Sequence, residues 1–487
     1  MPSTPPIPTY TVVGHPNEGK SSVVATLTED DSVRISAIPG ETTHSRTYPV
    51  QIDGRTVIQF VDTPGFQHPR KILDWFRTGG ADQGNLAREF VQSHSEDPEL
   101  AHDIELLKPL SEGCGIIYVI DGSRLISTTD RIEMEILRLT GNPRMAIINP
   151  KEYDEEIITE WKAACAKAFN SIRIFNAHKA TYAERIALLE SLKGINQDWE
   201  GALAQTIEAF EEDWSRRIHQ VAGILCELIR EASSYTQSKS IFSPGEEEAA
   251  RSELQTSYNK NLHKKERDAH QTLRKLFKHN IFQMDIPPHS ILHEDLFTSR
   301  TWQVLGLSKK QIVSTAAVLG GGIGVQLDLV AAGLTFGLFT VSGAVAGAMA
   351  AWLRGEDLAR TEIKKQKLGG IKITVGPNTN PQLPFILIDR GLLYFQHVSN
   401  WAHARSKPSE TPSDVIKFEP AKMGFTTQWT DQQRKSCLQF IKVVTNNAPY
   451  EKQAEAERKC RRMLEECLHE ISQPTSKSPS PSTPALE

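Results

Sequence analysis

The chain has 487 residues, with 55 Lys and Arg against 60 Asp and Glu, which gives a formal net charge of −5. This length predicts two to four domains with more than one hydrophobic core. The slightly acidic balance gives no general argument for nucleic-acid binding. Six scattered cysteines without a C-x-x-C pair argue against a disulfide framework or a zinc site. Residues 1–8 are polar and rich in proline, without a secretory pattern, so we expect a flexible N-terminus and a cytoplasmic protein.

A glycine-rich loop follows the first predicted strand, at residues 9–13. Gly14, Gly19, Lys20 and Ser21 fit the pattern G-x-x-x-x-G-K-[ST], and residues 21–27 have the composition of a helix. In such a loop the backbone N–H groups surround phosphates, the lysine contacts the β- and γ-phosphates, and the Ser hydroxyl ligates Mg²⁺. A chance Gly-rich turn is the alternative. The predicted nucleotide-binding residues of the loop are Gly14, His15, Pro16, Asn17, Glu18, Gly19, Lys20, Ser21 and Ser22.

A predicted hairpin at residues 48–52 and 56–61 leads to the turn Asp62, Thr63, Pro64 and Gly65. An Asp at this strand end would hold Mg²⁺ through a water, and the Gly65 amide would reach a γ-phosphate. Thr42, in the polar loop before the hairpin, is the expected second hydroxyl at the metal. The predicted magnesium site is therefore Ser21, Thr42 and Asp62, and the predicted catalytic groups are Lys20, Thr42 and Gly65.

The pattern of the about 130 residues after Gly65 predicts the remainder of an α/β domain. Helical spacing at 72–77, 84–95 and 102–110 indicates an enlarged, helical switch II region, or an insertion that only packs on the sheet. Predicted strands at 114–120, 145–148 and 171–175 alternate with helices at 129–140 and 182–192. This alternation predicts a doubly wound, mostly parallel sheet of the P-loop NTPase class.

The residues 14–21, 39–42 (PGET) and 62–65 (DTPG) resemble the G1, G2 and G3 boxes of the Era/TrmE-like bacterial GTPases, and the resemblance covers about residues 10–193. It implies binding of GTP and GDP with Mg²⁺ and a hydrolysing switch. Asn17 matches an asparagine that helps to hold K⁺ in several of these GTPases; a turn residue is the alternative. Phe66 stands where many related proteins have a water-orienting Gln. This implies slow intrinsic hydrolysis, or a catalytic group from a switch, a partner or a second G domain, with Gln67 and His68 as nearby candidates.

The base-binding motif departs from the family pattern N-K-x-D. Asn149 is present, Pro150 replaces the Lys, and Glu152 stands in the place of the Asp. The resemblance implies that Asn149 supports the loop, that Glu152 accepts hydrogen bonds from guanine, and that Asn176 and Ala177 contact the base. A relaxed choice of base is the alternative.

Beyond the G domain, at 9–195, the periodicity predicts a helical hairpin region at 196–300, with helices over 201–233 and 246–279. A basic cluster on the second helix is either a solvated face or a contact for lipid or RNA; its residues are Lys260, Lys264, Lys265 and Arg267. Residues 301–365 form a Gly/Ala-rich apolar hairpin region, in which 312–353 hold Asp328 as their only ionisable residue. The segment 312–353 is open to three interpretations: membrane insertion, a soluble core, or an oligomer seam.

A C-terminal α+β region is expected at 366–473, with a small hairpin of strands at 369–375 and 384–389 and helices at 392–404, 430–444 and 450–471. Cys460 and Cys467 lie seven residues apart on one helix face and are expected in the core. Residues 474–487 are predicted to be a disordered tail. The arrangement resembles a bacterial subfamily in which an Era-like G domain is joined to a domain of unknown function with such a hairpin.

The expected function is a GTP-binding switch with Mg²⁺-dependent hydrolysis to GDP and phosphate, coupled to a helical region at the inner face of the cell membrane or in the cytoplasm. A scaffold or membrane module with structural nucleotide is one alternative, and an RNA- or ribosome-associated GTPase is another. The expected partners are guanine nucleotide, a membrane surface through 312–353, and a second G domain. Nucleic acid is not expected, given the overall charge.

Overall fold

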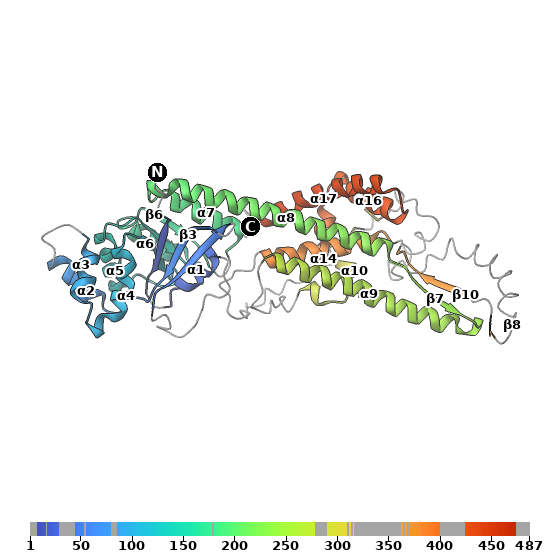
Figure 1. Cartoon of the computed structure of the whole chain (residues 1–487), viewed down its shortest axis with the longest axis horizontal. Coiled ribbons are helices and arrows are strands. Elements are labelled where there is room, and N and C mark those ends of the chain that lie inside the picture. The colour runs from blue at the N-terminus through green and yellow to red at the C-terminus, as the bar shows by residue number, and fades with distance from the viewer. Residues whose placement is uncertain are drawn as a thin grey trace, which may run out of the picture.

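The computed structural model describes residues 7–15, 17–28, 44–52, 55–78, 85–177, 180–277, 290–308, 311–312, 315, 362–363, 366–367, 371–378, 380–399 and 424–473. The described chain is elongated, with an α/β domain at one end and a helical region at the other (Figure 1). The predictions for Pro16, Thr42, the tail 474–487 and nearly all of 312–353 lie outside these residues.

The N-terminal domain is built on one six-stranded sheet with the order β2-β3-β1-β4-β5-β6. Its strands are β1 (Thr9–Val13), β2 (Arg46–Ile52), β3 (Arg55–Asp62), β4 (Gly115–Ile120), β5 (Arg144–Ile148) and β6 (Ser171–Ile174). All neighbours pair in parallel except β2, which pairs antiparallel with β3. All six residues of β4 are buried, as a central strand covered on both faces requires. The predicted doubly wound, mostly parallel sheet is confirmed.

Helices cover both faces of this sheet. They are α1 (Lys20–Thr28), α2 (Pro69–Thr78), α3 (Leu86–Ser93), α4 (Ala101–Ser111), α5 (Thr128–Leu139), α6 (Glu155–Cys165) and α7 (Tyr182–Lys193), with a short 3-10 turn η1 (Pro98–Leu100). One apolar core includes side chains from α1 and α7, and the other includes side chains from α2 to α6. The stretch between β3 and β4 is therefore helical, as expected, and it packs on the sheet through α2, α3 and α4.

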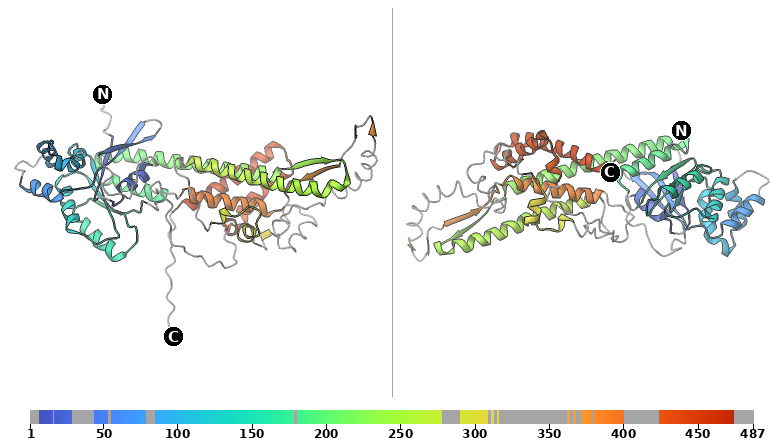
Figure 2. Two further views of the ribbon diagram at one scale, coloured as in Figure 1. Left: turned by 90° about the horizontal axis from the view of Figure 1, so that it is seen from below. Right: turned by 180° about the vertical axis from the view of Figure 1, so that it is seen from behind.

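The C-terminal region is a group of long helices (Figure 2). They are α8 (Glu200–Ser234), α9 (Glu247–Leu276), α10 (Ser299–Val304), α14 (Gln382–Ser399), α15 (Phe425–Gln428), α16 (Asp431–Thr445) and α17 (Tyr450–Ser472), with the 3-10 turns η2 (Gln197–Trp199), η3 (Pro244–Glu246) and η4 (Ile291–His293). α8 and α9 pack against each other as the expected helical pair. Cys460 and Cys467 are both buried in the core, as expected.

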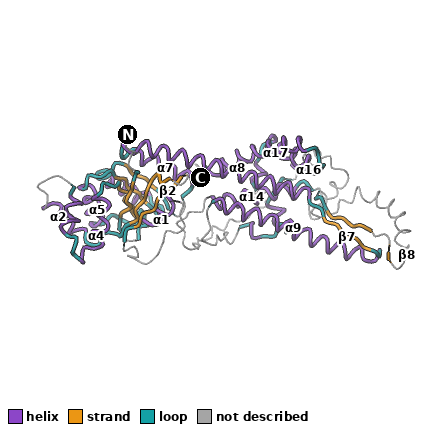
Figure 3. Tube along the Cα trace, viewed as in Figure 1, coloured by secondary structure: helices purple, strands orange, loops and turns teal. Residues whose placement is uncertain are grey.

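The predicted hairpin of strands at 369–375 and 384–389 is wrong in its second strand. β10 (Ile371–Val375) pairs antiparallel with β7 (Gln237–Ile241), which directly follows α8, whereas residues 384–389 belong to α14. Figure 3 shows this two-stranded ribbon beyond the end of α8. All residues from Gln382 to Leu392 are buried, so this run has no exposed face and its periodicity does not separate strand from helix. A further pair, β8 (Glu362–Ile363) and β9 (Gln366–Lys367), is antiparallel.

A single helix joins the two parts. The first turns of α8 place Leu203 and Ile207 in the core beneath the α/β sheet, and from Trp214 onward the same helix contributes to the core of the C-terminal region. Trp214 stacks on Tyr182 of α7 with ring centroids 4.1 Å apart. The two cores are thus continuous along α8. Among the described residues, no helix is long and apolar enough to span a bilayer.

Candidate functional site

The loop between β1 and α1 has the backbone that its glycines predict. Gly14 has φ = 146°, and a Cβ atom there would lie 2.4 Å from the carbonyl oxygen of Val119 in β4. Gly19 has φ = 94°, and a Cβ there would lie 2.5 Å from Nδ2 of Asn149. Only glycine fits at both positions, because the loop turns tightly against neighbouring strand ends.

Lys20 and Ser21 are the first two residues of α1, directly after this loop. The Lys20 ammonium donates to the carbonyl oxygens of Gly14 (3.2 Å) and His15 (3.1 Å), so the side chain folds back across the loop. Burial lowers the pKa of Lys20, and the nearby Asp62 carboxylate opposes that shift. A buried cation that is held by carbonyl oxygens alone is well placed to bind an anion at the loop.

Asp62 lies at the carboxyl end of β3, directly beside the loop. One of its carboxylate oxygens, Oδ2, accepts a hydrogen bond from the Ser21 hydroxyl at 2.7 Å. The other, Oδ1, is buried and has no hydrogen-bond partner among the described residues. Burial raises the pKa of Asp62, although the hydrogen bond from Ser21 and the charge of Lys20 oppose this. A buried carboxylate oxygen without a partner beside a Ser hydroxyl fits a hard cation such as Mg²⁺.

The turn after Asp62 is buried and anchored to the sheet. The Thr63 hydroxyl donates to the carbonyl oxygen of Val12 at 2.8 Å, and Pro64 and Gly65 are buried. Phe66 is 2% exposed and packs in the core of the α2–α6 face. Its side chain therefore does not take the place of a water-orienting group.

Gln67 and His68 are held by one buried carboxylate of α4. The backbone N–H of Gln67 donates to Oδ1 of Asp103 at 2.9 Å, and the backbone N–H of His68 donates to Oδ2 at 3.1 Å. The His68 ring also lies 3.1 Å from Oδ2 through Nδ1. The His68 ring is thus held by α4, whereas Gln67 is held by α4 only through its backbone and is exposed.

Asn149 connects the loop to the segment that follows β6. Its Nδ2 donates to the carbonyl oxygen of Glu18 at 3.0 Å, and its Oδ1 accepts from the backbone N–H of Ala177 at 3.2 Å. The Asn176 side chain donates to the carbonyl oxygen of Pro150 at 2.7 Å. The structure thus brings Glu18, Asn149, Asn176 and Ala177 together.

Glu152 is exposed, and its side chain forms no hydrogen bond or ion pair with a described residue. Its backbone N–H donates to the Ser123 hydroxyl at 3.0 Å, while Lys151 reaches Oδ2 of Asp121 at 2.7 Å. The carboxylate of Glu152 is therefore free of other ties, at the end of a loop that is fixed through its backbone. Asn17 is exposed and has φ = 67°, a left-handed conformation that asparagine tolerates, as the turn-residue alternative requires.

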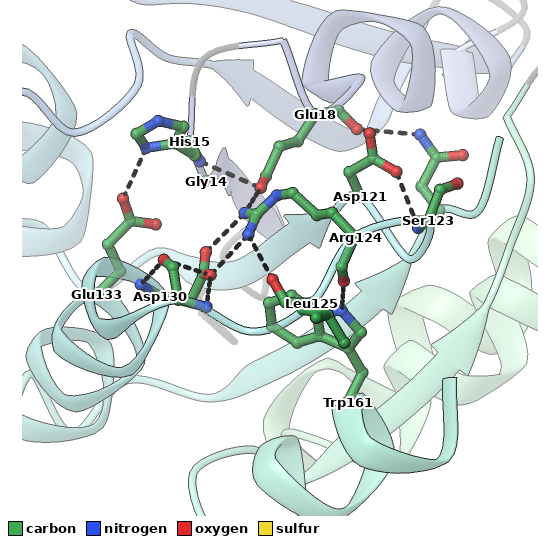
Figure 4. Close-up of polar contacts among 12 residues, drawn as sticks. Gly14, His15, Glu18, Asp121, Ser123, Arg124, Leu125, Asp130, Glu133 and Trp161 are labelled. Carbon is green, nitrogen blue, oxygen red and sulfur yellow. Dashed lines mark hydrogen bonds and ion pairs between the residues drawn. The ribbon is translucent and has the colours of Figure 1, made fainter. Parts of the chain in front are cut away.

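An ionic network supports the outer side of the P-loop (Figure 4). Glu18, which is 3% exposed, forms an ion pair with Arg124 from the loop between β4 and α5. Arg124 also donates to both carboxylate oxygens of Asp130 at 2.7 Å. Burial raises the pKa of Glu18 to about 7, while the Arg124 guanidinium opposes that rise. The Glu18 carboxylate is thus buried in the loop and paired with a cation from the segment before α5.

A second contact joins the same loop to α5. The His15 ring lies 3.3 Å from Oε1 of Glu133, and the other oxygen of Glu133 accepts from the Tyr118 hydroxyl at 2.9 Å. The hydrogen bond with Glu133 raises the pKa of His15 despite partial burial. Since α5 packs on α2, the P-loop is in contact with the helices that follow Asp62–Gly65 through a chain of packed elements.

Arg124, Asp130 and Glu133 are not predicted from the sequence, because they lie more than 100 residues from the loop that they support. Ser127 and Asp130 form a capping box at the start of α5, a spacing that can be recognised in a sequence. That signature locates the helix start but does not reveal Arg124 or its partner Glu18.

The comparisons with known proteins agree with this geometry. A family model described as "Domain of unknown function (DUF3482)" matches residues 162–470, and one described as "50S ribosome-binding GTPase" matches residues 9–150. The chain is 30% identical to GTPase Era of Ureaplasma parvum over 138 residues, which are 26% of this chain and 43% of that protein. It is 24% identical to the tRNA modification GTPase MnmE of Oceanobacillus iheyensis over 197 residues, which are 39% of this chain and 41% of that protein.

The chain thus spans less than half the length of these relatives. A solved structure of Era in complex with MgGDPNP and a segment of 16S ribosomal RNA aligns at 19% identity, covering 48% of this chain and 72% of that one, with a TM-score of 0.26. An overlap of this size does not bear on function. The sheet order, the loop geometry and the match over residues 9–150 together identify a P-loop GTPase domain of the Era/TrmE type.

Proposed function

We propose that this chain, which belongs to the DUF3482 family and carries an Era/TrmE-like GTPase domain, is a nucleotide-state switch that hydrolyses GTP to GDP and phosphate with Mg²⁺. The observation that carries the proposal is the convergence of Lys20, the Ser21–Asp62 pair and Asn149 on one loop at the carboxyl ends of β1, β3 and β5. Ligands of open α/β sheets bind at this edge.

In this proposal the loop amides between Gly14 and Ser22 bind the phosphates, and the Lys20 ammonium exchanges its carbonyl partners for phosphate oxygens. Ser21, Asp62 and Thr42 would hold Mg²⁺, which neutralises charge on the phosphates when it is bound. The backbone N–H of Gly65 would reach the γ-phosphate. Asn149 positions the loop, Asn176 and Ala177 line the base, and the free Glu152 carboxylate accepts the N–H groups of guanine.

Hydrolysis is expected to be slow without help, because the buried Phe66 offers no group to orient water. A second G domain or another partner would supply that group. Nucleotide state would change the loops at Thr42 and at Asp62–Gly65. Its route to the helical region is α8, which packs in both cores. We place this region at the inner face of the cell membrane, with 312–353 as the segment that contacts lipid.

Phosphate release from GTP tests the enzymatic part. We expect slow turnover in Mg²⁺ buffer and a loss of about 100-fold or more in Lys20→Ala, because the lysine stabilises the charge that develops on the phosphates. Lys162→Ala, an exposed lysine of α6, is the matched control and should leave the rate unchanged. GTP binding without any turnover would favour the scaffold alternative, in which the nucleotide is structural.

Potassium has its own test. If Asn17 helps to hold K⁺ near the phosphates, turnover should rise when Na⁺ is replaced by K⁺, and Asn17→Asp or Asn17→Gly should remove the response. Asn17→Gly retains the left-handed backbone. A K⁺ response that persists in Asn17→Gly would leave Asn17 as a turn residue only.

An RNA- or ribosome-associated GTPase is the second candidate function, and the description of the family that matches residues 9–150 favours it. Co-sedimentation of the full chain with ribosomes in GTP and in GDP distinguishes it from the first. State-dependent binding to ribosomes would favour this second function over a membrane-linked switch.

A further inference from the structure

The outer face of α9 carries a line of four cations, which we name the α9 stripe: Lys260, Lys264, Arg267 and Lys275. Their spacing of four, three and eight residues places them within an arc of about 80° on the helix. With a rise of about 1.5 Å per residue, the stripe is about 22 Å long. All four side chains are exposed, and the buried side chains of α9 lie on the opposite face: Leu254, Tyr258, Leu262 and Leu273.

None of the four cations of the stripe forms an ion pair with a described residue, although neighbouring cations do. Lys265, on another face of α9, reaches Glu231 of α8 at 2.9 Å, and Arg251 pairs with Glu247 at 2.8 Å. Asp268 is the one exposed acid within the basic half of the helix, from Lys260 to Lys275. Aligned like charges at these spacings repel one another and contribute nothing to folding.

We infer that the α9 stripe is a docking surface for an anionic lipid surface. α9 is a straight helix at the edge of the helical region (Figure 1), and the stripe occupies one exposed face of it, so its cations can meet one flat surface together. Attraction of clustered Lys and Arg to anionic headgroups needs proximity and charge but no pocket. Tyr258, the one Tyr of α9, is buried, and the helix contains no Phe or Trp, so it offers no such exposed ring on which single-stranded RNA bases would stack.

The chain near the stripe supports the same partner. His263, on the flank of the stripe, pairs with Asp295 at 2.7 Å through its Nε2 atom. The stretch held there leads along the sequence to the apolar residues 312–353. The inference rests on one part of the proposed function, the contact of the helical region with the membrane, and names a surface for it. It requires neither nucleotide binding nor hydrolysis.

Co-sedimentation of the full-length chain with vesicles tests the inference. One set of vesicles is phosphatidylcholine alone, and the other contains phosphatidylserine as well. The test variant carries Lys260→Gln, Lys264→Gln and Arg267→Gln. The matched control carries Lys452→Gln, Arg458→Gln and Arg462→Gln, which remove the same charge from exposed positions of α17, where acids such as Glu455 and Glu466 alternate with the cations.

We expect the wild type and the control to bind phosphatidylserine vesicles far better than neutral ones, and binding to fall as salt rises. The test variant should lose about 100-fold in affinity for the anionic vesicles, which corresponds to about 1 kcal/mol for each cation. Equal binding to both kinds of vesicle, equal affinity of the test and control variants, or binding to a mixed-sequence RNA with no binding to vesicles would overturn the inference.

A GTP titration of the same three proteins separates this inference from the GTPase proposal. The stripe lies outside the G domain, so the substitutions should leave GTP affinity and the thermal melting profile unchanged. Anionic vesicle binding without GTP binding would refute the switch and leave the stripe in place. GTP binding with no preference for anionic vesicles would refute the stripe as a lipid-docking surface and leave the GTPase proposal in place.

Discussion

At the scale of single residues, the P-loop depends on charges that lie outside its motif. Glu18 has a buried carboxylate in a loop that we expect to bind phosphates. The guanidinium of Arg124 forms an ion pair with this carboxylate and so compensates its negative charge. The interaction between Asn149 and the carbonyl oxygen of Glu18 fixes the same residue through its backbone. The loop is therefore positioned by residues from three strand ends.

Arg124→Ala should destabilise the G domain by about 2 kcal/mol, because it leaves the Glu18 carboxylate buried and unpaired. The loss is smaller than for a fully buried pair, since 34% of the Arg124 side chain is exposed. Thermal or urea unfolding measures it. In the background of Glu18→Gln, the same Arg124→Ala change should cost clearly less, and an equal cost in both backgrounds would show that the pair is not coupled.

His270 of α9 gives the C-terminal region a predicted pH dependence. Its ring stacks on Tyr394 with centroids 4.2 Å apart, and its buried Nε2 has no partner among the described residues. Burial lowers its pKa from 6.5 to about 4, with Glu266 opposing and Arg390 adding to the shift. As pH falls below 6.5 the unfolded chain takes up this proton before the folded chain does, so stability is lost between pH 6.5 and 4.

His270→Phe keeps a ring against Tyr394 and removes the titration. Relative to the wild type, it should gain stability as pH falls from 6.5 to 4, by at most about 3 kcal/mol. Urea unfolding at a series of pH values measures the difference. His263, whose pKa is raised by Glu266 and Asp295, acts in the opposite direction but is present in both proteins. His469→Phe, at an exposed position of α17, is the control for the exchange of an imidazole ring for a phenyl ring.

At the scale of elements, α8 is the part that turns two regions into one body. Leu203 and Ile207 pack under the sheet. Trp214 stacks on Tyr182 and contacts Phe277, the residue after α9, edge to face with ring centroids 5.7 Å apart. Arg185 of α7 lies over the rings of both Tyr182 and Phe210. α7 and α8 are thus in direct side-chain contact.

Trp214→Ala should cost about 3–5 kcal/mol, the range for a large aromatic side chain removed from a core. It should also uncouple the unfolding of the two regions. The variant should then show two separate transitions in urea, whereas the wild type should unfold more cooperatively. Tyr450→Ala, at a residue 84% exposed, should change stability by less than about 0.5 kcal/mol. A Trp214→Ala protein as stable and as cooperative as the wild type would show that α8 does not couple the regions.

At the scale of the whole molecule, the sequence predicts the G domain well because its strands are short apolar runs between recognisable phosphate-binding turns. The order of elements from β1 to α7 agrees with the expectation nearly throughout. The C-terminal region is harder. β7 is the polar run QSKSI, which has no strand-like alternation of apolar residues, and its partner β10 is 130 residues away. The site residues Arg124 and Glu133 were missed for the same reason, because only the fold brings them to Glu18 and His15.

The proposed switch combines these scales: a P-loop anchored to the strands around it, a helix shared by two cores, and a cationic face at the far region. The switch itself requires that the loop at Lys20 binds a nucleoside triphosphate. The departure at Pro150 and Glu152 makes the choice of base part of the same question.

Isothermal titration of the full chain with GTP, GDP, ATP and XTP in Mg²⁺ buffer, alongside Lys20→Ala, tests this claim most directly. The account predicts binding of GTP and GDP in preference to ATP, with GTP affinity reduced at least tenfold in Lys20→Ala because a charge-assisted contact with the phosphates is lost. A wild-type chain that binds none of the four nucleotides would contradict it, as would a Lys20→Ala variant that binds GTP as tightly as the wild type.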